Sequence, residues 1–264
     1  MTWEIFLINT AAVSLLMFCT WVVSLYKQDV SIIDLVWGSG FVLIAWLTWF
    51  WSGERSLIHL LLLICTTIWG VRLRIYLTWR KWGEGEDRRY RAIREKYGSA
   101  FTWKSLYLIF GFQALVMLIV SLPVQVGLAA DGQALPQGMQ QAIAATSFLF
   151  WLTGFLFESI GDYQMASFKQ NPQNQGKVLD TGLWKYTRHP NYFGDFLVWW
   201  GLGFMGVALS GQLWILIGPA VMSLFLMRIS GVTLLEKDLQ QRKPQYADYV
   251  ESTSAFFPRL PKSD

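Results

Sequence analysis

The 264-residue sequence has few charged residues and few side chains that bind metals tightly. Only 15% of its residues are charged, whereas a soluble protein of this size carries roughly a quarter. It has two cysteines and two histidines, and both cysteines, Cys19 and Cys65, lie inside apolar runs. This scarcity argues against a disulfide scaffold and against a zinc or other Cys-based site, so we predict no metal site.

The sequence is rich in long apolar segments instead. A helix needs about 20 apolar residues to cross a bilayer. Seven segments come close, at roughly residues 5–26, 31–51, 56–78, 105–128, 142–160, 192–209 and 212–230. No soluble domain, internal repeat or low-complexity tract separates them, so the pattern predicts an all-α, polytopic protein with seven transmembrane helices in a single domain. The first segment has no basic residues before it and no cleavage site, which favours a retained helix over a signal peptide.

The positive charges predict the orientation of these helices. Seven crossings place all but one of the 22 Lys and Arg residues on one side, and Arg55 is the exception. No Lys or Arg lies between Val124 and Gln141, in the longest loop on the other side. Under the positive-inside rule the C-terminus is cytoplasmic and the N-terminus is outside. We therefore expect an integral protein of a bacterial-type inner membrane.

The net charge of +4 follows from this topology and from attraction to anionic lipids. The basic residues flank helices and form no recognisable nucleic-acid reader. The expected partners are therefore membrane lipids and a small molecule that dissolves in them, and not nucleic acid.

The polar segment from Thr181 to Asp195 leads into the sixth apolar segment. Pro190 suits an early helix position, and the unpaired N–H groups of a helix start carry partial positive charge. The segment also offers a fixed cation, a titratable donor, an amide, a phenol and two flat rings, in Arg188, His189, Asn191, Tyr192, Trp184 and Tyr186. Such a set suits a nucleotide. An interfacial aromatic belt would explain Trp184 and Tyr186 but not the polar residues that follow.

A pair of acidic residues lies near the end of the fifth segment. Glu158 and Asp162 are four residues apart and share one helix face. Acidic residues at membrane depth are costly and usually face an internal cavity. A pairing with a nearby cation at the helix end is the alternative.

A basic loop follows the third segment. Arg72, Arg88 and Arg89 could clamp a diphosphate and a ribose 2′-phosphate, because guanidinium groups bind such oxygens in a bidentate manner. The alternative is a solvated cytoplasmic loop with pairing between Glu and Arg residues, and it is the better explanation for Arg91, Arg94 and Lys96.

Asp34 stands alone among apolar residues at the start of the second segment. An unpaired carboxylate there would be expensive, so Asp34 should be paired, protonated or exposed to a cavity. A carboxylate near Ser31 and the helix dipole is the structural alternative.

One motif carries a family resemblance. Gly-Leu-Trp-x-Tyr-x-Arg-His-Pro-Asn-Tyr-x-Gly-Asp, at 182–195, resembles the C-terminal signature of the membrane steroid 5-alpha-reductase family and of the related sterol C=C reductases. The resemblance extends from about Glu158 to Pro258 and includes Leu-Glu-Lys-Asp at 235–238 and the pair Tyr246 and Tyr249. A similar Arg-His-Pro element and acidic tail occur in isoprenylcysteine-type methyltransferases.

The resemblance implies an NADPH-dependent reductase of a conjugated C=C bond in a lipophilic enone, such as a 3-oxo-Δ4 steroid. It places an acid near the substrate carbonyl, for which Asp34 is the first candidate and Tyr76 the second. It matches Asp162 to a contact with the cofactor's adenosine, whereas the reductases commonly have Asn at the position of Glu158. The expected cofactor-binding residues are Arg72, Arg88, Arg89, Asp162, Lys169, Trp184, Tyr186, Arg188, His189, Asn191, Tyr192, Asp195 and Glu236.

Two other functions remain open. An S-adenosylmethionine-dependent methyltransferase of a prenyl-cysteine or a phospholipid would share the cytoplasmic cofactor face and the membrane substrate. The longer motif, with its Asn and Asp, favours the reductase. A transporter or scaffold is disfavoured because the polar residues concentrate at one face and line no route across the bilayer.

Overall fold

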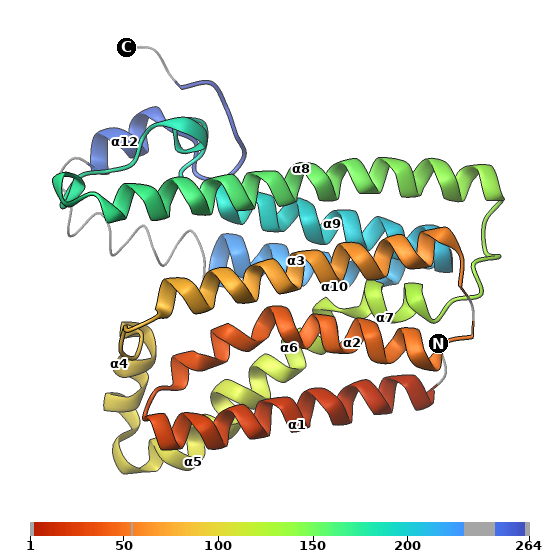
Figure 1. The fold of residues 1–264 in the computed structure, drawn as a ribbon, viewed down its shortest axis with the longest axis horizontal. Helices are drawn as coiled ribbons and strands as arrows, with labels where there is room; N and C mark the ends of the chain where they lie inside the picture. The colour runs from red at the N-terminus through yellow and green to blue at the C-terminus, as the bar shows by residue number, and fades with distance from the viewer. Residues whose placement is uncertain (1–2, 54, 230–245, 262–264) are drawn as a thin grey trace. The chain divides into compact units, whose positions relative to one another are not determined.

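The computed structural model describes residues 3–53, 55–229 and 246–261, and none of these residues forms a β-strand (Figure 1). The longer helices in these ranges are α1 (Trp3–Lys27), α2 (Trp37–Trp51), α3 (Leu57–Lys81), α4 (Arg88–Tyr97), α6 (Phe112–Val120), α7 (Leu122–Leu128), α8 (Gln137–Gln170), α9 (Pro190–Ser210), α10 (Ile217–Leu224) and α12 (Tyr246–Ser252). Shorter helical segments connect them: η1 (Val30–Val36), η2 (Gly98–Ala100), α5 (Phe101–Ser105), η3 (Leu106–Gly111), η4 (Pro172–Asn174), η5 (Gly182–Lys185), η6 (Leu213–Leu216) and η7 (Phe225–Ile229). The all-α prediction is confirmed for the described residues.

Six helical stretches in the described part of the chain are long and apolar enough to cross a membrane, and they coincide with the first six predicted segments. The seventh predicted segment forms a shorter apolar helical stretch, Leu213–Arg228. The fourth stretch begins earlier than predicted, at Arg88, because the amphipathic helix α4 precedes its apolar part. Six apolar helices are consistent with an integral membrane protein, and the seventh crossing and the orientation stay predictions.

The chain divides into two compact units. Unit 1 comprises residues 1–144 and 202–218, and unit 2 comprises residues 145–201 and 219–264. Both α8 and α9 therefore contribute to both units. The single transmembrane domain stays a prediction.

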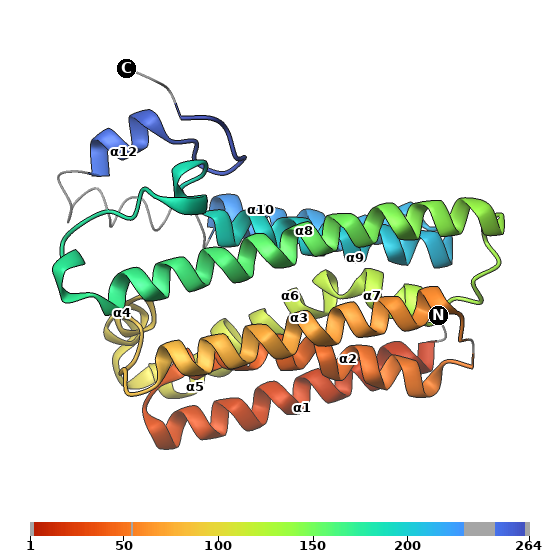
Figure 2. The same ribbon diagram turned by 45° about the horizontal axis from the view of Figure 1, so that its top comes forward.

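Within unit 1, α2 and α3 pack against each other along much of their length (Figures 1 and 2). A Cβ atom placed on Gly38 would collide with the backbone of Gly70, so the two glycines allow the helices to approach closely. A buried polar group ties α1 to both α2 and α7. The amide of Asn9 donates to Thr48 Oγ1 at 2.8 Å and to Gln125 Oε1 at 3.1 Å.

Within unit 2, α8 packs against the first half of α9. A Cβ atom on Gly194 would lie 2.8 Å from Cα of Glu158, and one on Gly154 would lie 2.7 Å from the nitrogen of Val198. These contacts bring the acidic end of α8 next to the start of α9. Helix α9 begins at Pro190, as the sequence predicts for a residue that has no backbone donor.

Candidate functional site

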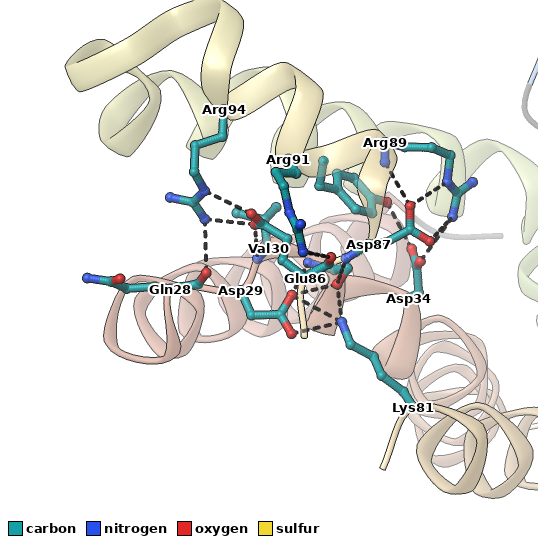
Figure 3. Close-up of polar contacts among 12 residues, drawn as sticks. Gln28, Asp29, Val30, Asp34, Lys81, Glu86, Asp87, Arg89, Arg91 and Arg94 are labelled. Atoms are coloured by element: carbon teal, nitrogen blue, oxygen red, sulfur yellow. Dashed lines mark hydrogen bonds and ion pairs between the residues drawn. The ribbon is translucent and has the colours of Figure 1, made fainter. Parts of the chain in front are cut away.

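Asp34 lies in the 3-10 segment η1 of unit 1, and two residues from α4 reach it (Figure 3). The hydroxyl of Tyr90 donates to Asp34 Oδ1 at 2.9 Å. Arg89 Nη2 lies 3.6 Å from Asp34 Oδ2, and the Asp34 side chain is 30% exposed. Asp34 is thus paired but accessible. Ser31 bonds to Asp29 and not to Asp34, so the pairing comes from a distant helix.

Two further side chains hold Tyr90 in place. The amide of Gln113, on α6, donates to the Tyr90 hydroxyl at 3.1 Å. The indole N–H of Trp37, the first residue of α2, donates in turn to Gln113 Oε1. The bonds form a chain from Trp37 through Gln113 and Tyr90 to Asp34. Each side chain in this chain of bonds restricts the rotation of the next one. Such restriction is a property of preorganised sites.

A clamp of ion pairs joins the segment around η1 to the loop before α4 (Figure 3). Lys81 Nζ lies 2.9 Å from Asp29 Oδ2 and also donates to the hydroxyl of Ser31. Arg94 Nη2 lies 2.7 Å from Glu86 Oε1, and the same oxygen accepts the backbone N–H of Val30 at 2.9 Å. We call these six residues the clamp.

The clamp alters the acidity of its carboxylates. Partial burial alone would raise the pKa of Asp29, but hydrogen bonds from Ser31 and Lys81 and the Lys81 charge hold it below its ordinary value. For Glu86, burial is likewise outweighed by the hydrogen bond and charge of Arg94 and by the Val30 N–H, so its pKa is lowered. Both carboxylates are therefore stabilised as anions.

The acidic end of α8 and the start of α9 form a second polar cluster, in unit 2. The amide of Asn191 donates to Asp162 Oδ1 at 3.1 Å, and Asp162 is 4% exposed. The indole N–H of Trp184 donates to the carbonyl of Gly161 at 3.1 Å. The hydrogen bond between Asn191 and Asp162 thus joins two of the residues expected to bind a cofactor.

Arg188 is buried, and it binds the C-terminal segment. Its Nη1 donates to the carbonyls of Val250 at 3.1 Å and Thr253 at 2.5 Å. Its backbone N–H donates to the carbonyl of Ser254 at 2.9 Å, and Tyr249 donates its hydroxyl to the carbonyl of Trp184 at 2.5 Å. Arg188 thus fastens the tail to the polar segment, which is a positioning role that the sequence did not indicate.

The remaining predicted residues of unit 2 vary in exposure. His189 is buried and stacks on Tyr192, with ring centroids 5.5 Å apart. Tyr186 is 39% exposed, and Lys169 is exposed at the end of α8. Asp195 lies one turn after Asn191 on α9. Glu236 lies outside the described residues.

The predicted basic residues of unit 1 differ in their neighbours. Arg89 binds Asp34 and Asp87, whereas Arg88 is exposed at the start of α4. The guanidinium of Arg72 lies over the ring of Tyr76, 5.2 Å from its centroid. The prediction of Glu and Arg pairing in this loop is confirmed by the Glu86–Arg94 pair.

Sequence reasoning missed Tyr90 and Gln113. Tyr90 stands among arginines and looks like part of a solvated loop. Gln113 carried a usable signal, because an amide in an otherwise apolar membrane segment needs a polar partner. Tyr249 was part of the quoted tail motif, but its bond to Trp184 could not be inferred from spacing.

The chain is similar to one protein family and to two known proteins. A family model described as "Protein of unknown function (DUF1295)" matches residues 20–253. An uncharacterized protein of Schizosaccharomyces pombe is 26% identical over 270 residues, which cover 91% of this chain and 76% of that protein. A probable O-methyltransferase of Ustilaginoidea virens is 34% identical over 71 residues, which cover 27% of this chain and 25% of that protein. No solved structure matches the chain.

Proposed function

The chain belongs to the DUF1295 family, and we propose that it is an NADPH-dependent membrane reductase of a conjugated C=C bond in a lipophilic enone. The observation that carries this proposal is the hydrogen bond from Tyr90 to Asp34, backed by Gln113. It supplies an oriented, partly exposed acid at the end of an apolar helix, where a substrate dissolved in the bilayer can reach it. The resemblance of the 182–195 motif to the steroid 5-alpha-reductases supplies the reaction type.

Tyr90 and Asp34 hold one proton between two oxygens, and the carbonyl oxygen of the enone is the third oxygen that can share it. A hydrogen bond to that oxygen stabilises the negative charge that develops on it when the double bond is reduced. NADPH, when bound, would supply the hydride for the β carbon. Arg89, 3.6 Å from Asp34, holds the carboxylate in place as the proton moves toward the substrate. In this proposal Tyr90 supports Asp34, whereas Tyr76, the second candidate acid, contacts the guanidinium of Arg72.

The polar cluster of unit 2 fits a nucleotide by its chemistry. A buried carboxylate, Asp162, is already engaged by a neutral amide, and a carboxylate of this kind can accept hydrogen bonds from ribose hydroxyls. The carbonyl oxygen of Asn191 accepts the backbone N–H of Tyr192 at 3.1 Å, which leaves one lone pair of that oxygen and the second amide N–H to meet a ligand. The exposed ring of Tyr186 and the exposed ammonium of Lys169 would suit a base and a phosphate. Arg188 would act by holding the tail.

A second function has its own support. The probable O-methyltransferase of Ustilaginoidea virens shares a 71-residue match with this chain, and the Arg-His-Pro element is common to both enzyme classes. In such an enzyme S-adenosylmethionine would take the place of NADPH. Asp34 would then accept a proton from the substrate and would not donate one.

Cofactor titration distinguishes the two functions. Purified protein is heated in detergent with NADPH or with S-adenosylmethionine, and the reductase proposal expects only NADPH to raise the melting temperature. A ligand at 100 times its dissociation constant adds about 2.7 kcal/mol of stability. Asn191→Ala should weaken NADPH binding by roughly 1–3 kcal/mol, the usual cost of an unmet hydrogen bond. Stabilisation by S-adenosylmethionine alone would replace the reductase by the methyltransferase.

A further inference from the structure

A groove with a volume of about 560 Å³ lies between α2 and α3 in unit 1. Its lining is mainly apolar and includes Val42, Val71, Ile75 and Trp79. None of its lining residues belongs to the clamp or to the Asp34 cluster. The proposed reduction therefore does not account for it.

The groove contains one cation, Arg74. Its Nη1 donates to the hydroxyl of Ser39 at 2.9 Å, so the guanidinium reaches across from α3 to α2. In the described residues Arg74 forms no ion pair, whereas Lys81, Arg89 and Arg94 each face a carboxylate. Among the described residues, the guanidinium of Arg74 is therefore bonded to a neutral hydroxyl and to no carboxylate.

The position of Arg74 along α3 relates it to the membrane surface. It lies seven residues before the end of the helix at Lys81, which is about 10 Å at 1.5 Å per residue. Trp79 and Trp82 follow it and are 52% and 83% exposed, as expected of residues at a membrane interface. A long arginine side chain extends toward that interface. A cation at this depth is costly without an anion, so the site favours a negatively charged ligand.

We propose that this groove binds one anionic phospholipid. The phosphate would lie on the guanidinium of Arg74, and an acyl chain would run along Val71 and Ile75. The hydroxyls of Ser39 and Thr78 lie in the same lining and can bond to the glycerol of the headgroup. A zwitterionic lipid offers the same acyl chains, but its ammonium group cancels the attraction. Free phosphate offers the charge without the apolar contact.

The measurement is lipid binding to the full chain in a neutral detergent, by native mass spectrometry. Phosphatidylglycerol should bind at least tenfold more tightly than phosphatidylcholine of the same chain length. Arg74→Gln should remove most of that preference. Arg80→Gln is the matched control, because Arg80 is an exposed arginine on the same helix and does not line the groove. It should keep the preference.

A second variant tests the apolar half of the site. Ile75 is 64% exposed, so Ile75→Trp can fill the groove without disturbing the core or removing Arg74. It should weaken phosphatidylglycerol binding as well. Equal binding of the two lipids would overturn the proposal, as would equal losses in Arg74→Gln and Arg80→Gln, which indicate only a general basic face. Competition by inorganic phosphate as effective as that by the lipid would show an anion site and no lipid site.

Discussion

Asp34 gains its partners from a helix that lies 56 residues further along the chain. The local sequence offers Ser31 as a partner, yet that hydroxyl is taken by Asp29. The carboxylate is left for Tyr90, which donates a hydrogen bond to it, and for Arg89, which supplies the opposite charge. Asp34 is thereby held in one orientation while its side chain stays 30% exposed.

Substitution of Asp34 tests this role directly. Asp34→Asn keeps the shape and can still bond to Tyr90, but it cannot hold or release the shared proton. We expect turnover of an enone substrate to fall at least about a hundredfold, as is common when an acid or oxyanion donor is lost. NADPH affinity should hardly change, because Asp34 is not part of the polar cluster of unit 2 that we propose for the nucleotide. The measurements are single-turnover kinetics, NADPH affinity and melting temperature.

Tyr90→Phe is the companion variant, because it removes the hydroxyl and leaves Asp34 paired with Arg89. A similar loss of turnover in both variants indicates that the pair acts as one unit. If Asp34 has only a structural role, the variants should lose stability and not turnover. The melting temperature falls, while turnover per folded molecule stays near normal.

For single residues, the sequence shows which side chains are unexpected in an apolar segment, but it does not show which groups they bond to. Asp34 and Asp162 stood out because carboxylates are rare in apolar segments, and each proved to be hydrogen-bonded. Arg188 also stood out, but its guanidinium binds tail carbonyls, and spacing along the chain could not show this. Tyr90 looked solvated because its neighbours are arginines, and only the fold brings it to Asp34.

The helix boundaries were predicted well where a long apolar segment determines the helix. The ends of α1, α3 and α9 lie within a few residues of the predicted apolar segments, because the need to satisfy backbone groups in lipid makes long apolar runs helical. Helix α4 was not predicted, since it has no buried residue and no apolar run. The π-helical segment η3 is likewise invisible to an apolar count.

The α2–α3 contact predicts a cost for one added methyl group. Gly38→Ala places a Cβ atom against the backbone of Gly70, which cannot yield as a flexible side chain can. We expect a loss of roughly 1–3 kcal/mol, typical of overpacking. Gly138→Ala is the control, because that glycine is also helical and has no atom within 4 Å of the added Cβ. Equal unfolding midpoints for the two variants in detergent would contradict the close helix contact.

The clamp predicts a pH dependence of local stability. Asp29 and Glu86 have lowered pKa values in the folded protein. Their contribution to stability is therefore complete when the pH is above their pKa values in the unfolded chain, which are near 4. It is lost as the pH falls through their pKa values in the folded protein. Hydrogen exchange of the Val30 amide, which bonds to Glu86, measures the local stability of the clamp. Protection, corrected for intrinsic exchange, should be constant from about pH 5 to 7 and decline below about pH 4.

Arg94→Gln provides the matched comparison for the clamp, since it removes the cation that lowers the Glu86 pKa. Its Val30 amide should lose protection at a higher pH than in the natural chain. A profile that stays flat down to pH 3 in both proteins would show that the ion pairs do not hold this segment.

Over the whole molecule, the distribution of cations is the strongest constraint on topology. With seven crossings all Lys and Arg residues except Arg55 share one side, and the Val124–Gln141 loop on the other side has none. With six crossings the C-terminal cations, from Arg228 onward, would change sides. The positive-inside rule disfavours that arrangement.

The seventh crossing is the prediction most at risk. The stretch Leu213–Arg228 has 16 residues, or about 24 Å of helix at 1.5 Å per residue, whereas the hydrocarbon core is about 30 Å thick. A short span is accommodated by local thinning of the bilayer and by flanking residues that reach the interface, and Trp214 and Arg228 stand near its two ends. We therefore expect a C-terminal reporter to be cytoplasmic and one at Gly132, between α7 and α8, to be external. Reporters on the same side would show that this stretch enters the membrane without crossing it.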